Sequence, residues 1–138
     1  MPEYVNPERE IFGQFQALDR RGPIHMLNLV RVYDQVTYDD GSQASGLEAY
    51  ASYGKQSGPV FSRVGGKIIW SGDFELNLIG PQEERWDIAF IAEYPSANAF
   101  VEMVKDPIYQ QAVRHRTLAV KDSRLVRMGP KTVSSEFG

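Results

Sequence analysis

One arginine occupies a position suited to anion binding. If residues 107–120 form a helix, Arg116 shares the apolar stripe with Tyr109 and two valines, because at about 100° per residue the four lie within an arc of about 60°. A guanidinium in such a stripe needs partners, and its planar fork matches the two oxygens of a carboxylate or enolate. Two interpretations stay open: an anion clamp for a ligand, or a buried salt bridge to Glu93 or Asp106.

Other polar side chains also stand where apolar ones are expected. Tyr50 and Tyr53 fall about 60° apart on a predicted helix, so their hydroxyls could orient a ligand or donate a proton, or simply bond a backbone carbonyl within the core. Tyr109 has the same two interpretations. Asn28 brings an amide into an apolar strand, where a neighbour, a water or a ligand must satisfy it. The predicted ligand-binding residues are Asn28, Tyr50, Tyr53, Tyr109 and Arg116.

Two histidines are the remaining candidates for proton transfer. His25 has the opposite strand parity to Asn28, so the two do not line one cavity. His115 is flanked by two arginines, a setting that would lower its pKa. We take His115 and Tyr50 as candidate catalytic residues, with a solvated or structural histidine as the alternative.

The composition excludes several kinds of site. With no cysteine, the chain has no disulfide, thiolate zinc site, iron–sulfur cluster or cysteine nucleophile. Three aspartates at 34, 39 and 40 lack the closing glutamate of a calcium loop. The motifs of a Rossmann cofactor site, a P-loop, an α/β-hydrolase and a zincin are also missing. We therefore expect no metal and no cofactor.

The elements that would position these residues follow from periodicity and turn chemistry. Helices are predicted over 7–21, 47–64, 96–105 and 107–120, with a kink or break near Gly58. Ser96 and Asp106 are the predicted N-caps of the last two helices, and Gly65-Gly66 is the predicted left-handed stop of the second. Strands are predicted over 24–33, 67–79, 86–94 and 124–128, and 34–46 is a polar stretch with a predicted turn at Asp40-Gly41. After the first helix the order is β-α-β-β-α-β, which is the ferredoxin-like α+β plan with a four-stranded antiparallel sheet and helices on one face.

The length of 138 residues fits one domain. We expect an N-terminal helical extension over 1–23, the ferredoxin-like domain over 24–129 and a flexible tail over 130–138. The predicted strands carry apolar residues at both parities, so the second sheet face also needs cover, and a second copy of the chain is the economical partner. This predicts a homodimer.

The charge and the N-terminal sequence bear on other partners. A net charge of −3 argues against nucleic acid, which needs a basic face. The start lacks a basic and apolar leader pattern, and no stretch is long and apolar enough to span a bilayer. We expect a cytoplasmic protein that binds neither nucleic acid nor membrane.

From Leu47 onward the sequence resembles a known family. The residues that carry the likeness are Tyr50, Tyr53, Pro59, Gly65-Gly66-Lys67, Glu93-Tyr94-Pro95-Ser96, Asp106-Pro107-Ile108-Tyr109 and Arg116. Together they resemble the uncharacterised domain family thirteen-thirty of the dimeric α+β barrel superfamily, over roughly residues 24–128. The resemblance implies a small homodimeric α+β barrel, in a superfamily that includes cofactor-free monooxygenases, lactone isomerases, haem-degrading enzymes and stress-response proteins. It does not choose among these activities.

Two hypotheses about function follow. In the first, the protein binds a small carboxylate-bearing or aromatic metabolite between helices and sheet, and any chemistry is that of a cofactor-free isomerase or monooxygenase, with Arg116 holding an anion. In the second, it is a non-catalytic interaction or stress-associated dimer whose polar core groups only fix the packing. The sequence leaves open whether the protein is an enzyme.

Overall fold

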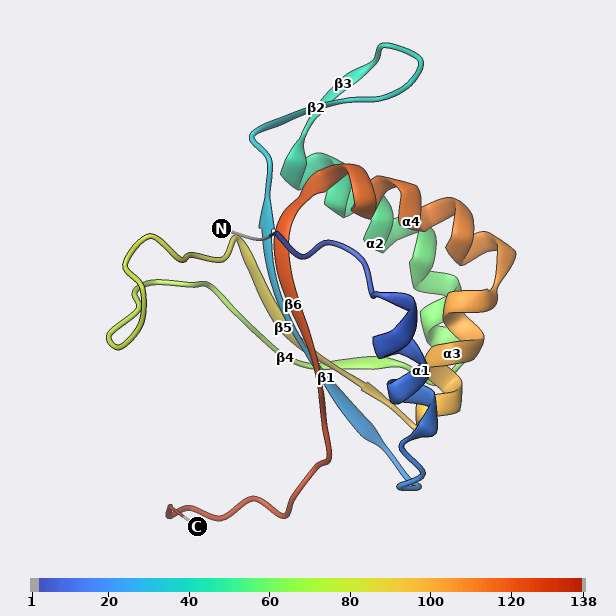
Figure 1. Ribbon diagram of the computed structural model, residues 1–138, viewed down its shortest axis with the longest axis vertical. Helices are drawn as coiled ribbons and strands as arrows, with labels where there is room; N and C mark the ends of the chain where they lie inside the picture. The colour runs from blue at the N-terminus through green and yellow to red at the C-terminus, as the bar shows by residue number, and fades with distance from the viewer. Residues whose placement is uncertain (1–2, 138) are drawn as a thin grey trace.

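The computed structural model describes residues 3–137, and a four-stranded antiparallel sheet forms its centre (Figure 1). The strands are β1 (Ile24–Val32), β4 (Lys67–Gly72), β5 (Ile88–Tyr94) and β6 (Val120–Met128). They lie in the order β4-β5-β1-β6, with every neighbouring pair antiparallel. This is the ferredoxin-like order, so the predicted α+β fold is confirmed.

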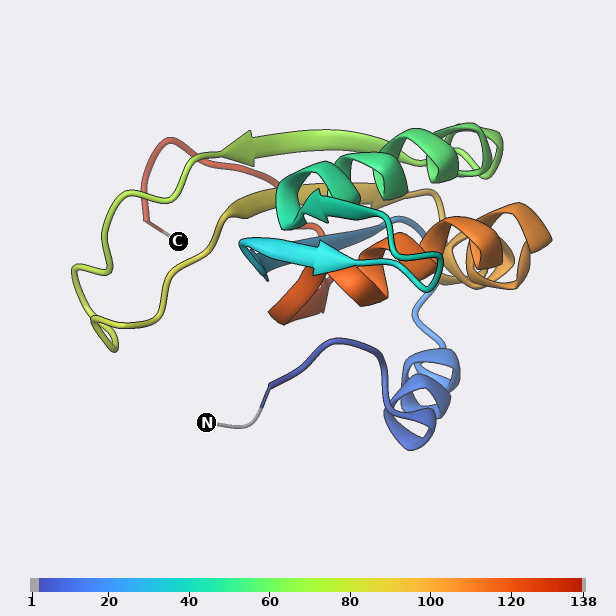
Figure 2. The ribbon, with the colours of Figure 1, turned by 90° about the horizontal axis from the view of Figure 1, so that it is seen from above.

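Helices cover one face of the sheet. They are α1 (Arg9–Ala17), α2 (Gly46–Arg63), α3 (Ala97–Lys105) and α4 (Pro107–Ala119). Figures 1 and 2 show α2 and α4 side by side over the sheet. Helix α1 packs against α3, where the rings of Phe15 and Phe100 lie 5.2 Å apart.

Side-chain caps set the starts of three helices. Ser45 and Glu48 form a reciprocal capping box at α2, with the Glu48 amide donating to Ser45 Oγ at 3.0 Å. Ser96 accepts from the Ala99 amide at α3, and Asp106 accepts from the Ile108 amide at α4. The caps predicted at positions 96 and 106 are confirmed.

Two helix predictions need correction. The first helix is shorter than 7–21, and its N-cap is Glu8, which makes no side-chain cap bond. Helix α2 continues unbroken past Gly58 although Pro59 lies inside it. Buried Val60 and half-buried Phe61 follow the proline and pack on the core, so tertiary contacts carry the helix across it. The helix ends at Arg63, and Gly65, two residues farther on, has a φ of 89° and provides the expected left-handed stop.

Two strand predictions also change. Strand β4 ends at Gly72 rather than at residue 79, because β5 begins only at Ile88 and pairs no farther than Gly72. Residues 73–87 form a loop on the side away from the helices (Figure 1). The polar stretch 34–46 contains a small hairpin of β2 (Gln35–Thr37) and β3 (Gln43–Ser45), which has the expected turn at Gly41.

The two faces of the sheet differ in burial. Even-numbered β1 residues face the helices, and Ile24, Met26 and Val30 are buried there. We call this side the inner face. On the opposite, outer face an apolar row crosses all four strands through cross-strand pairing. This outer row is Trp70, Ile91, Leu27 and Val126.

No helix in the described part of the chain has the length and apolar character needed to cross a bilayer.

Candidate functional site

Three tyrosines meet between the helices and the inner face. Tyr50 and Tyr53 come from α2, and their ring centroids are 5.3 Å apart. Tyr109 comes from the first turn of α4, and its hydroxyl lies 2.9 Å from that of Tyr53. We call these three residues the tyrosine cluster. The structure therefore brings together three of the five residues predicted to bind a ligand.

Burial governs the acidity of this cluster. It raises the pKa of Tyr50, Tyr53 and Tyr109 above the ordinary value near 10.0, while the nearby Arg116 guanidinium acts in the opposite direction. The phenols stay protonated at physiological pH, so they act as hydrogen-bond donors or acceptors and not as bases. Such donors suit a developing oxyanion.

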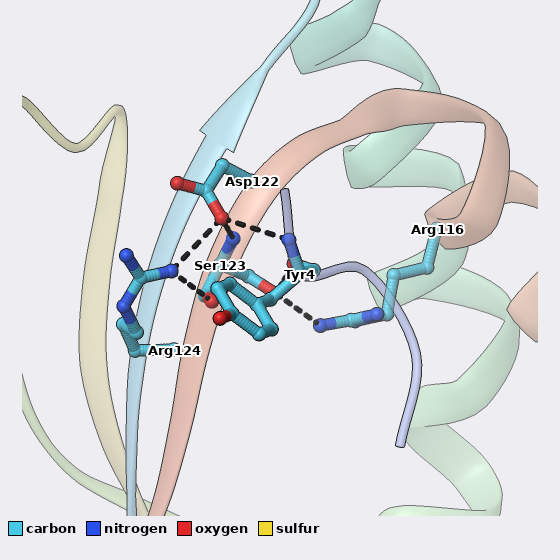
Figure 3. A network of polar contacts seen from close by, with 5 residues as sticks. All are labelled: Tyr4, Arg116, Asp122, Ser123 and Arg124. Carbon is cyan, nitrogen blue, oxygen red and sulfur yellow. Dashed lines mark hydrogen bonds and ion pairs between the residues drawn. The ribbon is translucent and has the colours of Figure 1, made fainter. Parts of the chain in front are cut away.

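Arg116 joins the same layer from α4. The residue is only 8% exposed and lies on the buried side of α4 with Tyr109, whereas Val120 of the predicted stripe belongs to β6. Its Nη1 donates to the Val5 carbonyl, and its Nη2 lies 3.4 Å from Ser123 Oγ on β6. Figure 3 shows the side chain extending from α4 towards β6 and the N-terminal segment.

Neither carboxylate suggested as the partner of Arg116 binds it. Glu93 lies on the outer face, where it contacts His25 at 2.8 Å and Lys67 at 3.4 Å. Asp106 caps α4 and pairs with Arg63 at 2.8 Å. Within residues 3–137, Arg116 forms no ion pair. Among the described residues, its hydrogen-bond acceptors are the neutral oxygens of the Val5 carbonyl and the Ser123 hydroxyl.

Asn28 lies on the inner face, with Phe90 and Leu125 as its cross-strand neighbours. Its Nδ2 donates to the Met26 carbonyl at 3.0 Å, so a neighbour satisfies part of the amide. Phe90 packs against the same apolar cluster that contains Tyr50. Asn28 thus shares the layer of the tyrosine cluster.

The two histidines lie outside the tyrosine cluster. His25 binds Glu93 on the outer face, as its strand parity predicts. His115 is buried, and its Nδ1 lies 2.7 Å from the hydroxyl of Tyr38, next to the β2–β3 hairpin. Its Nε2 is buried with no hydrogen-bond partner in the described chain. Burial and, to a lesser extent, Arg114 lower the pKa of His115, which favours the neutral ring.

The sequence did not point to Val5, Tyr38 or Ser123 as partners of the candidate residues. Tyr38 and Ser123 carry hydroxyls in segments that showed no apolar stripe, and Val5 contributes only its backbone carbonyl. A backbone acceptor far away in sequence leaves no side-chain signal.

A hollow of about 510 Å³ opens beside β4 and β5. It contains none of the predicted site residues, and two of its side chains are aspartates. Its lining is Ile68, Ser71, Gly72, Asp73, Asp87, Ile88, Ala89 and Phe90. The aspartates disfavour an anionic ligand there, so a carboxylate is better matched to Arg116.

Comparison with known proteins decides the family. Residues 42–129 match the family described as Domain of unknown function (DUF1330). The chain belongs to this family. No curated protein matches the sequence.

This DUF1330 protein is similar to another protein, RPA0582, in sequence and in fold. Two crystal structures of RPA0582 show the likeness. The RPA0582 protein of unknown function from Rhodopseudomonas palustris is 57% identical, with 96% of this chain and 100% of that chain covered and a TM-score of 0.91. The methylated RPA0582 protein gives 58% identity, coverages of 96% and 98% and a TM-score of 0.92.

A more distant structure has a similar fold. It is a dimeric ferredoxin-like protein of unknown function from Thermobifida fusca, 18% identical, with 80% of this chain and 93% of that chain covered and a TM-score of 0.51.

Proposed function

We propose that this DUF1330 protein is a cytoplasmic homodimer that binds a small aromatic carboxylate between its helices and its sheet. Arg116 holds the carboxylate, and the tyrosine cluster with Asn28 lines the site. The observation that carries the proposal is the buried Arg116 guanidinium that has no carboxylate partner in the described chain.

The energetics of Arg116 support this role. A buried charge without a counter-charge is costly, and proteins normally pair it. A guanidinium has five N–H donors, and the described chain supplies acceptors to two of its nitrogens. A ligand carboxylate would bring both the missing charge and a bidentate acceptor. Neighbouring tyrosine rings offer aromatic surface to the rest of the ligand.

The outer face supports the homodimer. Half of the Trp70 surface and 38% of the Val126 surface are exposed in the single chain. An apolar face of this kind normally marks a partner surface, and two-fold pairing with a second copy covers it on both chains. The Thermobifida fusca protein of similar fold is itself described as dimeric.

For an enzyme at this site, cofactor-free isomerase or monooxygenase chemistry fits best. The protonated phenol of Tyr50 would donate a hydrogen bond to an oxyanion or enolate that forms on the bound carboxylate ligand. His115, neutral and hydrogen-bonded to Tyr38, is the proposed proton acceptor, and the accepting atom would be Nε2, which has no hydrogen-bond partner among residues 3–137. The competing function is a non-catalytic interaction or stress-associated dimer.

Benzoate is a suitable probe for the binding site. Isothermal titration should give measurable binding to the native protein, and Arg116→Gln should weaken it at least 10-fold, because a charge-assisted bidentate contact is lost. Benzyl alcohol, which lacks the carboxylate, should bind weakly to both proteins. Arg127→Gln is a matched control, since Arg127 also donates to a backbone carbonyl, that of Phe15 at 2.8 Å.

The two hypotheses give different results. Loss of benzoate binding in Arg116→Gln but not in Arg127→Gln supports the ligand site. If the native dimer binds no benzoate and Arg116→Gln only lowers its thermal stability, Arg116 is structural and the non-catalytic dimer is the better description.

A further inference from the structure

The N-terminal segment lies over the candidate anion site. We call residues 3–6 the N-terminal arm. The Tyr4 carbonyl accepts from Ser123 Oγ at 2.7 Å, and the Val5 carbonyl accepts from Arg116 Nη1. The arm thus supplies two backbone oxygens to the two groups, Arg116 and Ser123, that face each other between α4 and β6 (Figure 3).

Side chains of β6 hold the arm in place. The Tyr4 amide donates to Asp122 Oδ1 at 3.0 Å. The Arg124 guanidinium lies 5.0 Å from the Tyr4 ring centroid and 5.3 Å from that of Trp86. Burial would raise the pKa of Asp122, but the bonds from Tyr4 and Arg124 hold it below the ordinary value, so the carboxylate is charged at neutral pH.

The arm is weakly attached compared with the sheet below it. No backbone group of residues 3–6 bonds another backbone group of the described chain. Tyr4 is 51% exposed, Asn6 is exposed and only Val5 is half-buried. A segment with few buried apolar contacts and no backbone ladder opens at low free-energy cost.

The acceptors that the arm offers are also weaker than those of a ligand. The Val5 carbonyl is neutral, whereas a carboxylate would bring a negative charge and two oxygens to the same guanidinium. The Tyr4 carbonyl that accepts from Ser123 is likewise neutral, so a carboxylate would also be a stronger acceptor there. The arm therefore satisfies hydrogen bonds at the site without neutralising its charge.

We infer that the N-terminal arm is a displaceable strap: a small carboxylate replaces the Val5 and Tyr4 carbonyls at Arg116 and Ser123, and the arm leaves β6 when the ligand binds. The inference rests on the proposed function, because it concerns the same anion site. Ligand affinity is then the intrinsic affinity of the open site multiplied by the fraction of molecules in which the arm is open.

The test uses the full chain and benzoate as the probe. Tyr4→Ala removes the ring that stacks on Arg124 and leaves Arg116 and Ser123 in place. Benzoate affinity should rise about 2- to 5-fold in Tyr4→Ala, since one exposed cation–π contact holding the arm is lost. The matched control is Tyr33→Ala, which removes another exposed tyrosine and should leave the affinity unchanged.

Hydrogen exchange of the Tyr4 amide gives an independent readout. In the native protein this amide is bonded to Asp122, and saturating benzoate should speed its exchange at least 10-fold. Benzoate that binds in an Arg116-dependent way while Tyr4 exchange and Tyr4→Ala affinity stay at native values would overturn the strap and leave the ligand site standing. If neither the native protein nor Tyr4→Ala binds benzoate, the strap and the proposed function are both wrong.

Discussion

The inner and outer faces of the sheet are made by the same strands, yet only one is covered within a single chain. On β1, Ile24 and Val30 of the inner face are 0% exposed. Leu27, which stands between them in the same strand, lies in the outer row beside Ile91 and Val126. Because successive side chains of a strand point to opposite faces, neighbouring residues of one strand serve different tasks.

This difference separates stability from assembly. The helices cover the inner face within one chain, so substitutions there should change the free energy of unfolding at any protein concentration. The outer face is left to a partner, so changes there should act on association. The following predictions test that separation, beginning with the largest effect.

A charge in the outer row should break the proposed dimer. Ile91→Lys places an ammonium at the centre of the row on both copies, and burying each charge costs several kcal/mol. Self-association should weaken more than 100-fold, which sedimentation velocity would show as a shift from dimer to monomer. Ile11→Lys, at an exposed isoleucine of α1, is the matched control and should stay dimeric. A dimeric Ile91→Lys would mean that the outer face is not the interface.

A truncation on the inner face should instead lower the free energy of unfolding. Ile24→Ala removes a fully buried side chain, and such a change costs about 2–5 kcal/mol. Urea denaturation followed by circular dichroism measures this loss. The separation of the two faces predicts that the dimer dissociation constant of the folded variant stays at its native value.

The buried tyrosines should destabilise the fold at alkaline pH. Burial raises the pKa of Tyr50, Tyr53, Tyr94 and Tyr109 above the ordinary value near 10.0. The unfolded chain therefore loses these protons first, and stability falls as the pH rises. Between pH 8 and 10 the free energy of unfolding should drop by about 1–2 kcal/mol in total.

Absorbance at the tyrosinate band checks this point. In the folded protein these four phenols should ionise only when the protein unfolds, whereas in concentrated urea all seven tyrosines should titrate together near pH 10. One common transition near pH 10 in the folded protein would contradict the buried cluster.

The smallest effect concerns the polar end of the outer face. The hydrogen bond from His25, and secondarily the contact with Lys67, lowers the pKa of Glu93 from its ordinary value near 4.5 against the opposing effect of burial. A lowered carboxyl pKa stabilises the fold above the unfolded value, and this contribution is lost as the pH falls through the folded value.

A double-mutant cycle measures that contribution. His25→Gln and Glu93→Gln should show a coupling below about 1 kcal/mol at pH 6, typical of a partly exposed pair. The coupling should fall as the pH drops through the folded pKa of Glu93 and the carboxylate becomes protonated. A coupling that does not change with pH would show that charge is not its source.

Much of the fold could be predicted because its signals are local. Ser96, Asp106 and Gly65 act within a few residues of where they stand, and the sequence located all three. The strand predicted to reach residue 79 shows the limit. Leu76, Leu78 and Ile79 have an apolar pattern, but a strand needs a partner, and none extends beyond Gly72.

The candidate site could be predicted only in part, because some of its contacts are local in sequence and others join distant residues. Helical spacing identifies Tyr50, Tyr53 and Arg116 as neighbours in one layer, since the two tyrosines face the sheet from α2 and the arginine faces it from α4. What Arg116 binds depends on a backbone oxygen 111 positions away in the chain. No residue type at position 5 would signal that contact.

The irregular register of β4 has a consequence for solubility. This edge strand carries three successive exposed apolar residues, Ile68, Ile69 and Trp70, and an exposed apolar edge is a template for unlimited strand addition. The register shifts between Ile68 and Trp70, and Lys67 and Asp73 flank the segment with charges. The bulge breaks the flat hydrogen-bonding edge that an incoming strand would need, so growth of the sheet ends at four strands and fibril formation is disfavoured.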